Sequence, residues 1–92
     1  MVNGYYKENK KHGKWEHYSS KNHLVEVSNY NNGILEGIYE KYHYNGKLEQ
    51  RGNYKDGKKD GEWVKYNSLG DQMSNTIYKE GNVIYGESVI TD

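Results

Sequence analysis

The sequence predicts an all-β protein, an elongated antiparallel meander of 24-residue β-hairpin repeats. The chain repeats itself every 24 residues without a gap, and self-similarity at a fixed period is typical of repeat architectures. Turn-forming pairs such as Asn32-Gly33 and Asp56-Gly57 separate runs rich in Tyr, Trp, Val and Ile, as expected for hairpins. The chain has no Pro, which suits a continuous hydrogen-bonded ladder.

The repeat is clearest in three seven-residue segments that begin at His12, Glu36 and Asp60. Each segment has Gly at its second position, an aromatic ring at its fourth and Tyr at its seventh. These residues are Gly13, Gly37 and Gly61; Trp15, Tyr39 and Trp63; and Tyr18, Tyr42 and Tyr66. We therefore predict one domain, residues 1–92, of three units (12–35, 36–59 and 60–83) with partial units at 1–11 and 84–92.

Each unit is predicted to contain two strands joined by tight turns. We place strands near 3–7, 12–19, 23–31, 36–43, 47–55, 60–67, 71–79 and 83–90. Two-residue turns are predicted at Asn32-Gly33, Asn45-Gly46, Asp56-Gly57 and Glu80-Gly81. Towards the C-terminus, Tyr85-Gly86 is slipped out of register, and Val89 and Ile90 are candidates for a closing strand.

Equivalent residues of successive units are expected to share one face of the sheet. Side chains of a strand alternate between its two faces, and the repeat length of 24 is even. Trp15, Tyr39 and Trp63 are therefore predicted to stack as one structural ladder, and the tyrosines at 18, 42 and 66 as another. Gly13, Gly37 and Gly61 are expected to serve backbone geometry rather than phosphate binding, because no helix follows them.

The composition limits the kind of core and the class of partner. Leu, Ile and Val together number 15 and Phe is absent, whereas Tyr and Trp number 11 and 2. The chain should therefore fold around shallow aromatic ladders. The 13 basic and 13 acidic residues cancel, which argues against a general polyanion binder. Without Cys, neither disulfides nor thiolate sites can form.

No targeting or membrane-spanning segment is evident in the sequence. The N-terminal residues lack the apolar core of a signal peptide, and the longest apolar runs are far shorter than a membrane span requires. We therefore expect a soluble, cytoplasmic protein.

Six residues carry a resemblance to the MORN repeat: Tyr54, Gly57, Gly61, Trp63, Tyr66 and Gly70. The chain resembles more closely the bacterial variant found in YwqK-like antitoxins, in which Gly-x-Trp is followed three residues later by Tyr. The resemblance extends over roughly residues 5–86, with departures at Asn22, Gln72 and Tyr85-Gly86. It implies a β-hairpin array that binds proteins, with lipid binding proposed for some eukaryotic members, and it implies no catalytic residues.

Neither a metal site nor an enzyme active site is predicted. The four histidines align with ordinary polar residues in the other units; His12, for example, aligns with Glu36 and Asp60. None has a partner at metal-ligand spacing. A nucleophile and its base would occupy single positions that break the repeat, and no such break combines Ser, His and an acid. We therefore expect no cofactor and no enzymatic activity.

The candidate partner-binding residues are tyrosines and lysines. Tyr18, Tyr42 and Tyr66 are not needed for the tryptophan ladder, and exposed Tyr is favoured at protein interfaces. Tyr44 replaces Ser20 and Ser68 of the other units, which makes it a unit-specific contact candidate. Lys10, Lys11, Lys58 and Lys59 belong to two equivalent lysine clusters. These clusters either keep foreign strands off the exposed turns and edge or form a basic surface for RNA, DNA or an acidic protein.

The leading hypothesis from the sequence is a non-enzymatic inhibitor that binds one protein. The expected target is a toxin or nuclease effector, which makes the chain an antitoxin, an immunity protein or a phage-borne anti-defence protein. The alternative is a nucleic-acid-binding module that uses the tyrosines and lysines. A peripheral membrane or scaffold role is less favoured because the net charge is zero. A homodimer that pairs through the unpaired edges of the sheet is a further alternative.

Overall fold

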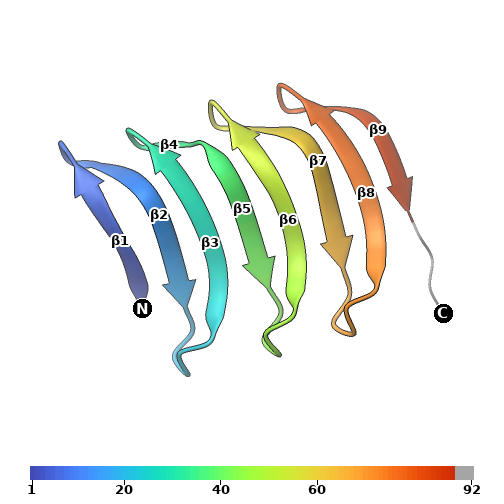
Figure 1. Ribbon diagram of the computed structural model, residues 1–92, viewed down its shortest axis with the longest axis horizontal. Helices are drawn as coiled ribbons and strands as arrows, with labels where there is room; N and C mark the ends of the chain where they lie inside the picture. The colour runs from blue at the N-terminus through green and yellow to red at the C-terminus, as the bar shows by residue number, and fades with distance from the viewer. Residues whose placement is uncertain (89–92) are drawn as a thin grey trace.

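A computed structural model describes residues 1–88 of the chain. These residues form a single antiparallel sheet in the order β1-β2-β3-β5-β6-β7-β8-β9, with the short β4 beside β3 (Figure 1). The Cα atoms extend over 47 × 35 × 11 Å, so the molecule is one sheet thick, since two packed sheets would add roughly 10 Å between layers. The predicted all-β meander of hairpins, open rather than closed, is confirmed. Val89 and Ile90, the candidates for a closing strand, lie outside the described residues.

The strand bounds follow the predicted ones closely. The strands are β1 (Val2–Lys7), β2 (Lys10–Tyr18), β3 (Leu24–Asn31), β4 (Ile34–Leu35), β5 (Gly37–Tyr42), β6 (Leu48–Lys55), β7 (Lys58–Tyr66), β8 (Gln72–Lys79) and β9 (Asn82–Ser88). The expected strand at 36–43 corresponds to β5, and the two-residue β4 that precedes it was not predicted.

Two-residue turns join the strands at one end of the sheet, called here the short-turn end. They lie at 8–9, 32–33, 56–57 and 80–81, so three of the predicted turns are confirmed and Glu8-Asn9 is a further one. Both residues of each turn have positive φ, as type I′ turns require. The N–H of Gly33 donates to the carbonyl of Lys11 at 2.8 Å, and the glycines at 57 and 81 repeat this bond. The hydrogen-bonded ladder therefore continues through the turns.

Five-residue loops join the strands at the opposite end, called here the long-loop end (Figure 1). They comprise residues 19–23, 43–47 and 67–71. The prediction of a two-residue turn at Asn45-Gly46 is wrong: the N–H of His43 donates to the carbonyl of Lys47 at 2.8 Å, which encloses a longer loop. Gly46 still supplies the positive φ that this loop needs, at 88°. Asn22 does so in the first loop at 62°, since Asn tolerates the left-handed region better than most residues.

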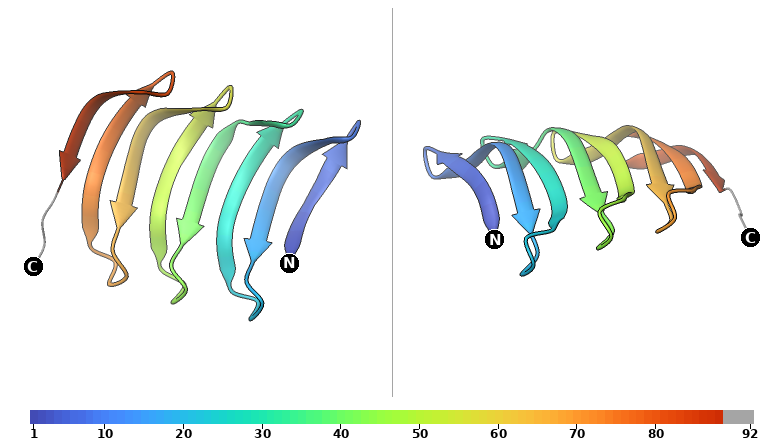
Figure 2. Two further views of the ribbon diagram at one scale, coloured as in Figure 1. Left: turned by 180° about the vertical axis from the view of Figure 1, so that it is seen from behind. Right: turned by 60° about the horizontal axis from the view of Figure 1, so that its bottom comes forward.

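Irregular pairing at β2 and at β7 lays a tryptophan ring across the neighbouring strand. Residues 61–63 of β7 face only Gly52 of β6, and residues 13–15 of β2 face only Gly4 of β1 in the same way. Gly61 and Gly13 have φ of 73° and 77°, values that Gly adopts at little cost. The strands bow together (Figure 2).

The folded-over rings form the apolar layer of one face, called here the tryptophan face. Trp63 is 3% exposed and its ring lies 5.0 Å from Tyr54, 5.7 Å from Tyr39 and 6.3 Å from Tyr78. Its indole N–H donates to the carbonyl of Asn53 at 3.0 Å. This arrangement buries the largest side chain of the sheet without a second layer.

The predicted aromatic ladder is present only in part. Tyr39 and Trp63 stack with an interplanar angle of 30°, whereas the described ring contacts of Trp15 are with Tyr6 and Tyr30. Between β5 and β7 the intervening residue is Gly52, but between β2 and β5 it is Ser28. The Ser28 side chain is buried and takes up space that a glycine leaves free for stacked rings.

Candidate interaction surface

The face opposite the tryptophans carries Tyr18, Tyr42 and Tyr66 at the ends of β2, β5 and β7, and is called here the tyrosine face. Each of these residues follows a register shift against the next strand and pairs with residue 24, 48 or 72. All three are half-buried. The repeat therefore places them in a row along the long-loop end.

Three hollows lie along this row. Tyr42 lines a hollow of about 390 Å³ between the first two long loops, together with Tyr44, Leu24 and Val25. Tyr66 lines one of about 310 Å³ with Ile38, Arg51 and Val64, and another of about 340 Å³ with Leu48. These volumes are at the small end of ligand pockets, roughly 300–1,000 Å³.

Tyr44 and Tyr42 differ in how far the surrounding chain buries them. Tyr44 is 88% exposed at the tip of its loop, so its ring makes little contact with the rest of the chain. Burial raises the pKa of the Tyr42 hydroxyl above its ordinary value, and the neighbouring Glu40 carboxylate raises it further, against a smaller opposing effect of Arg51. The Tyr42 hydroxyl therefore stays protonated over the physiological range and can donate or accept a hydrogen bond.

The structure does not bring the lysine candidates to the tyrosine row. Lys10 and Lys58 begin β2 and β7 at the short-turn end, whereas Tyr18 and Tyr66 end the same strands. The stems of Lys10 and Lys58 cover the turn glycines at 33 and 81. The two sets of residues are therefore separated by the length of a strand.

Lys11 and Lys59 are engaged within the chain. The Lys59 ammonium lies 4.7 Å from the Trp63 ring centre and 5.2 Å from that of Tyr78. Lys11 repeats this geometry over Trp15 at 4.7 Å. Such cation–π contacts stabilise the fold, so these two ammonium groups are not free for a partner.

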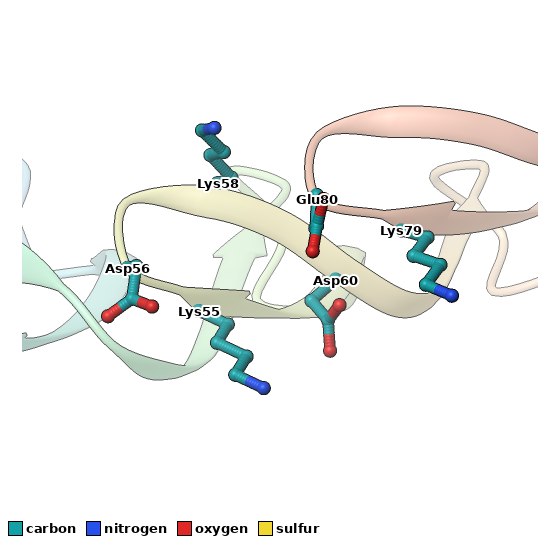
Figure 3. A pocket seen from close by; sticks show the side chains of 6 residues that line it. All are labelled: Lys55, Asp56, Lys58, Asp60, Lys79 and Glu80. Carbon is teal, nitrogen blue, oxygen red and sulfur yellow. The ribbon is translucent and has the colours of Figure 1, made fainter.

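The surroundings of Lys58 are of mixed charge (Figure 3). A depression of about 550 Å³ at the short-turn end is lined by Lys55, Asp56, Lys58, Asp60, Lys79 and Glu80. Three positive groups alternate with three negative ones, and Figure 3 shows their side chains splayed apart. A surface of zero net charge does not favour phosphate, so the structure lends no support to a continuous basic surface here.

Two of the histidines, His12 and His43, make contacts within the fold. The Nδ1 atom of His12 accepts the N–H of Asn32 at 3.3 Å, and Glu36 accepts that of Asp56 in the equivalent turn at 3.2 Å. His43 lies with Nε2 2.9 Å from the Tyr66 carbonyl and Nδ1 3.4 Å from Glu49. Among residues 1–88, no group of three or more His, Asp or Glu side chains is placed to hold a metal ion. In the same part of the chain, no helix is long and apolar enough to cross a membrane.

Sequence reasoning missed the residues that complete the hollow beside Tyr44, namely Ser19, Lys21, His23, Leu24 and Val25. One signal was available: Val25 stands where the other units have Glu49 and Met73. No protein-family model matches this chain, and no curated protein matches it.

Proposed function

We propose that the chain is a non-enzymatic inhibitor that binds one protein through the tyrosine face and its long-loop end. The target is a toxin or nuclease effector, so the chain acts as an antitoxin, an immunity protein or an anti-defence protein, in the cytoplasm.

The observation that carries this proposal is the tyrosine row with its hollows. Protein interfaces favour Tyr, and the residues that dominate binding energy fill well-packed pockets near the interface centre. Tyr42 and Tyr66 line such hollows, and Tyr44 stands beside one of them, fully available for contact.

The nature of the target rests on a separate argument. The Gly-x-Trp strand followed by Tyr resembles the repeats of antitoxins, and the chain carries no constellation of catalytic residues that breaks its repeat. A single sheet of 47 × 35 Å can cover an effector's active site without any chemistry of its own.

Site-specific crosslinking in the native host tests the proposal. A photoreactive amino acid is placed at position 44, on the tyrosine side of the long-loop end. A matched chain carries it at position 34, where Ile34 is 52% exposed at the short-turn end. The expected result is one protein adduct from position 44 and none from position 34, with the captured protein inhibited at one-to-one stoichiometry by the purified chain.

Other results overturn the proposal. Equal adducts from both positions would remove the tyrosine face as the binding surface. A captured protein whose activity is unaffected would remove the inhibitor function. Nucleic acid in place of a protein, with affinity that falls steeply above about 50 mM salt, would establish the nucleic-acid alternative.

A further inference from the structure

The two gaps between successive long loops are built differently. In the gap between loops 43–47 and 67–71, three side chains of loop 43–47 reach backbone carbonyls of residues 66–69. His43 lies 2.9 Å from the Tyr66 carbonyl, Asn45 donates to that of Ser68 at 2.8 Å, and Lys47 to that of Leu69 at 3.2 Å. Hydrogen bonds bridge this gap, and the hollow of about 340 Å³ lined by Lys47, Leu48, Tyr66 and Gly70 lies beside them.

The gap between loops 19–23 and 43–47 has no such bridges among the described residues. The equivalents of the three bridging residues are Ser19, Lys21 and His23. The Ser19 hydroxyl is used within its own loop, where it accepts the N–H groups of Lys21 and His23 at 3.3 and 3.2 Å. The hollow of about 390 Å³ occupies this unbridged gap.

The unbridged gap has apolar side chains at two positions where the bridged gap has polar ones. Val25 replaces the Glu49 of the next unit, and Tyr44 replaces Ser68. With Leu24 and Tyr42 they make an apolar floor and wall. An apolar side chain that binds against this floor and wall would be removed from water. Residues that dominate binding energy fill desolvated pockets of this kind.

Lys21 gives the rim of the open gap one positive charge. Lys21 and His23 line the hollow and no acidic residue does. Within residues 1–88, neither of these two side chains forms an ion pair. An incoming carboxylate therefore meets a lysine that has no competing partner.

We propose that this hollow is the anchor site for an acidic segment of the partner protein, one that inserts an aromatic or branched apolar side chain flanked by carboxylates. The inference rests on the proposed function, because it names the chemistry of the partner at the same surface. The apolar side chain fills the space between Tyr42 and Tyr44, and the carboxylate pairs with Lys21.

The test is nuclear magnetic resonance titration of the ¹⁵N-labelled full chain with three blocked tripeptides. The probes are phenylalanine between two aspartates, phenylalanine between two lysines, and serine between two aspartates. The first is expected to shift the amides of residues 21–25 and 42–44 saturably, and to bind roughly ten-fold more tightly than either of the others.

Variants separate the hollow from the rest of the face. Tyr44→Ser introduces the residue of the third unit at an exposed position, and it should weaken the first probe by roughly ten-fold. The triple change Ser19→His, Lys21→Asn and His23→Lys introduces the bridging residues of loop 43–47 and should weaken the first probe, because it bridges the gap and removes the Lys21 ammonium. Lys21→Glu should reverse the preference towards the lysine-flanked probe.

The outcomes distinguish this inference from the proposed function. Absence of saturable shifts in these segments, or equal binding of all three probes, overturns the anchor site. An effector that the chain still inhibits equally well after Tyr44→Ser and Lys21→Glu also overturns the anchor site but leaves the inhibitor function standing. Probe binding without any inhibited protein partner supports the hollow and removes the inhibitor function.

Discussion

Gly52 lies directly beneath the indole of Trp63: a Cβ atom at position 52 would stand 2.0 Å from Cδ2 of that ring. Gly4 has the same relation to Trp15, with 2.3 Å to the equivalent ring atom. In the middle unit the equivalent residues are Ser28 and the smaller Tyr39. The larger ring, Trp, therefore occurs with Gly at the equivalent position, and the smaller ring, Tyr, occurs with Ser.

Gly52→Ala should destabilise the fold by about 1–3 kcal/mol, because the new methyl group displaces a ring that is almost completely buried. Chemical denaturation measures the loss. Gly86→Ala is the matched control, since its Cβ would meet only Thr76 Oγ1 at 4.0 Å. The pair Gly52→Ser with Trp63→Tyr recreates the middle unit and should cost less than the sum of its single changes. Equal losses for positions 52 and 86 would contradict the explanation.

Trp63→Ala should cost about 3–5 kcal/mol of a total stability of about 5–14 kcal/mol. Trp15→Ala should cost less, because Trp15 is only half-buried near the N-terminal edge of the sheet. Thermal and denaturant unfolding of both variants check the order. A larger loss for Trp15 would show that the edge of the array, and not its centre, limits stability.

Alkaline pH should destabilise the chain through Tyr39. Burial raises the pKa of the Tyr39 hydroxyl well above its ordinary value, and the hydrogen bond to Glu26 raises it further. Above about pH 10 the unfolded chain loses this proton while the folded chain keeps it. The contribution of Tyr39 is therefore complete below about pH 10 and falls as the pH rises towards the folded-state pKa.

The measurement is the free energy of unfolding between about pH 9 and pH 11. Tyr39→Phe cannot titrate and should show a shallower decline over that range. Tyr54, whose pKa burial also raises, leaves part of the decline in place. Identical slopes for the two proteins would exclude Tyr39 as a source of alkaline sensitivity.

Lys59→Met should lower the stability by about 0.5–1 kcal/mol, because it removes the ammonium group from above the rings of Trp63 and Tyr78. Lys58→Met is the neighbouring control. Lys58 is exposed and contacts no ring in the described structure, so its replacement should change the stability by less than about 0.5 kcal/mol. Comparable losses from both substitutions would indicate a general effect of charge rather than the ring contact.

Tyr44→Ala should weaken partner binding by about 1–2 kcal/mol, a factor of roughly 5–30 in Kd, with no change in the unfolding temperature. The matched control is Leu69→Ala, since Leu69 is 74% exposed in the next long loop but lines none of the hollows described. Titration calorimetry with the captured effector measures both variants. Full retention of affinity by Tyr44→Ala would exclude this tip from the interface.

The sequence by itself determined the properties that depend on neighbouring residues. Its 24-residue period, its turn glycines and the alternation of its strands identified the meander, the positions of most strands and turns, and the separate faces of Trp63 and Tyr66. These features are local, because a positive φ or a twofold alternation acts within a few residues.

The tertiary structure alone decided the properties that depend on strands distant in sequence. The lysine candidates lie away from the tyrosine candidates: Lys59 lies over Trp63 and Tyr78, and Lys58 covers Gly81. The open gap beside Tyr44 exists because loop 19–23 lacks side chains that reach the next loop. Contacts between β7 and β8 set the first feature, and contacts between loops 24 residues apart set the second; no local pattern encodes whether such a gap is bridged or open.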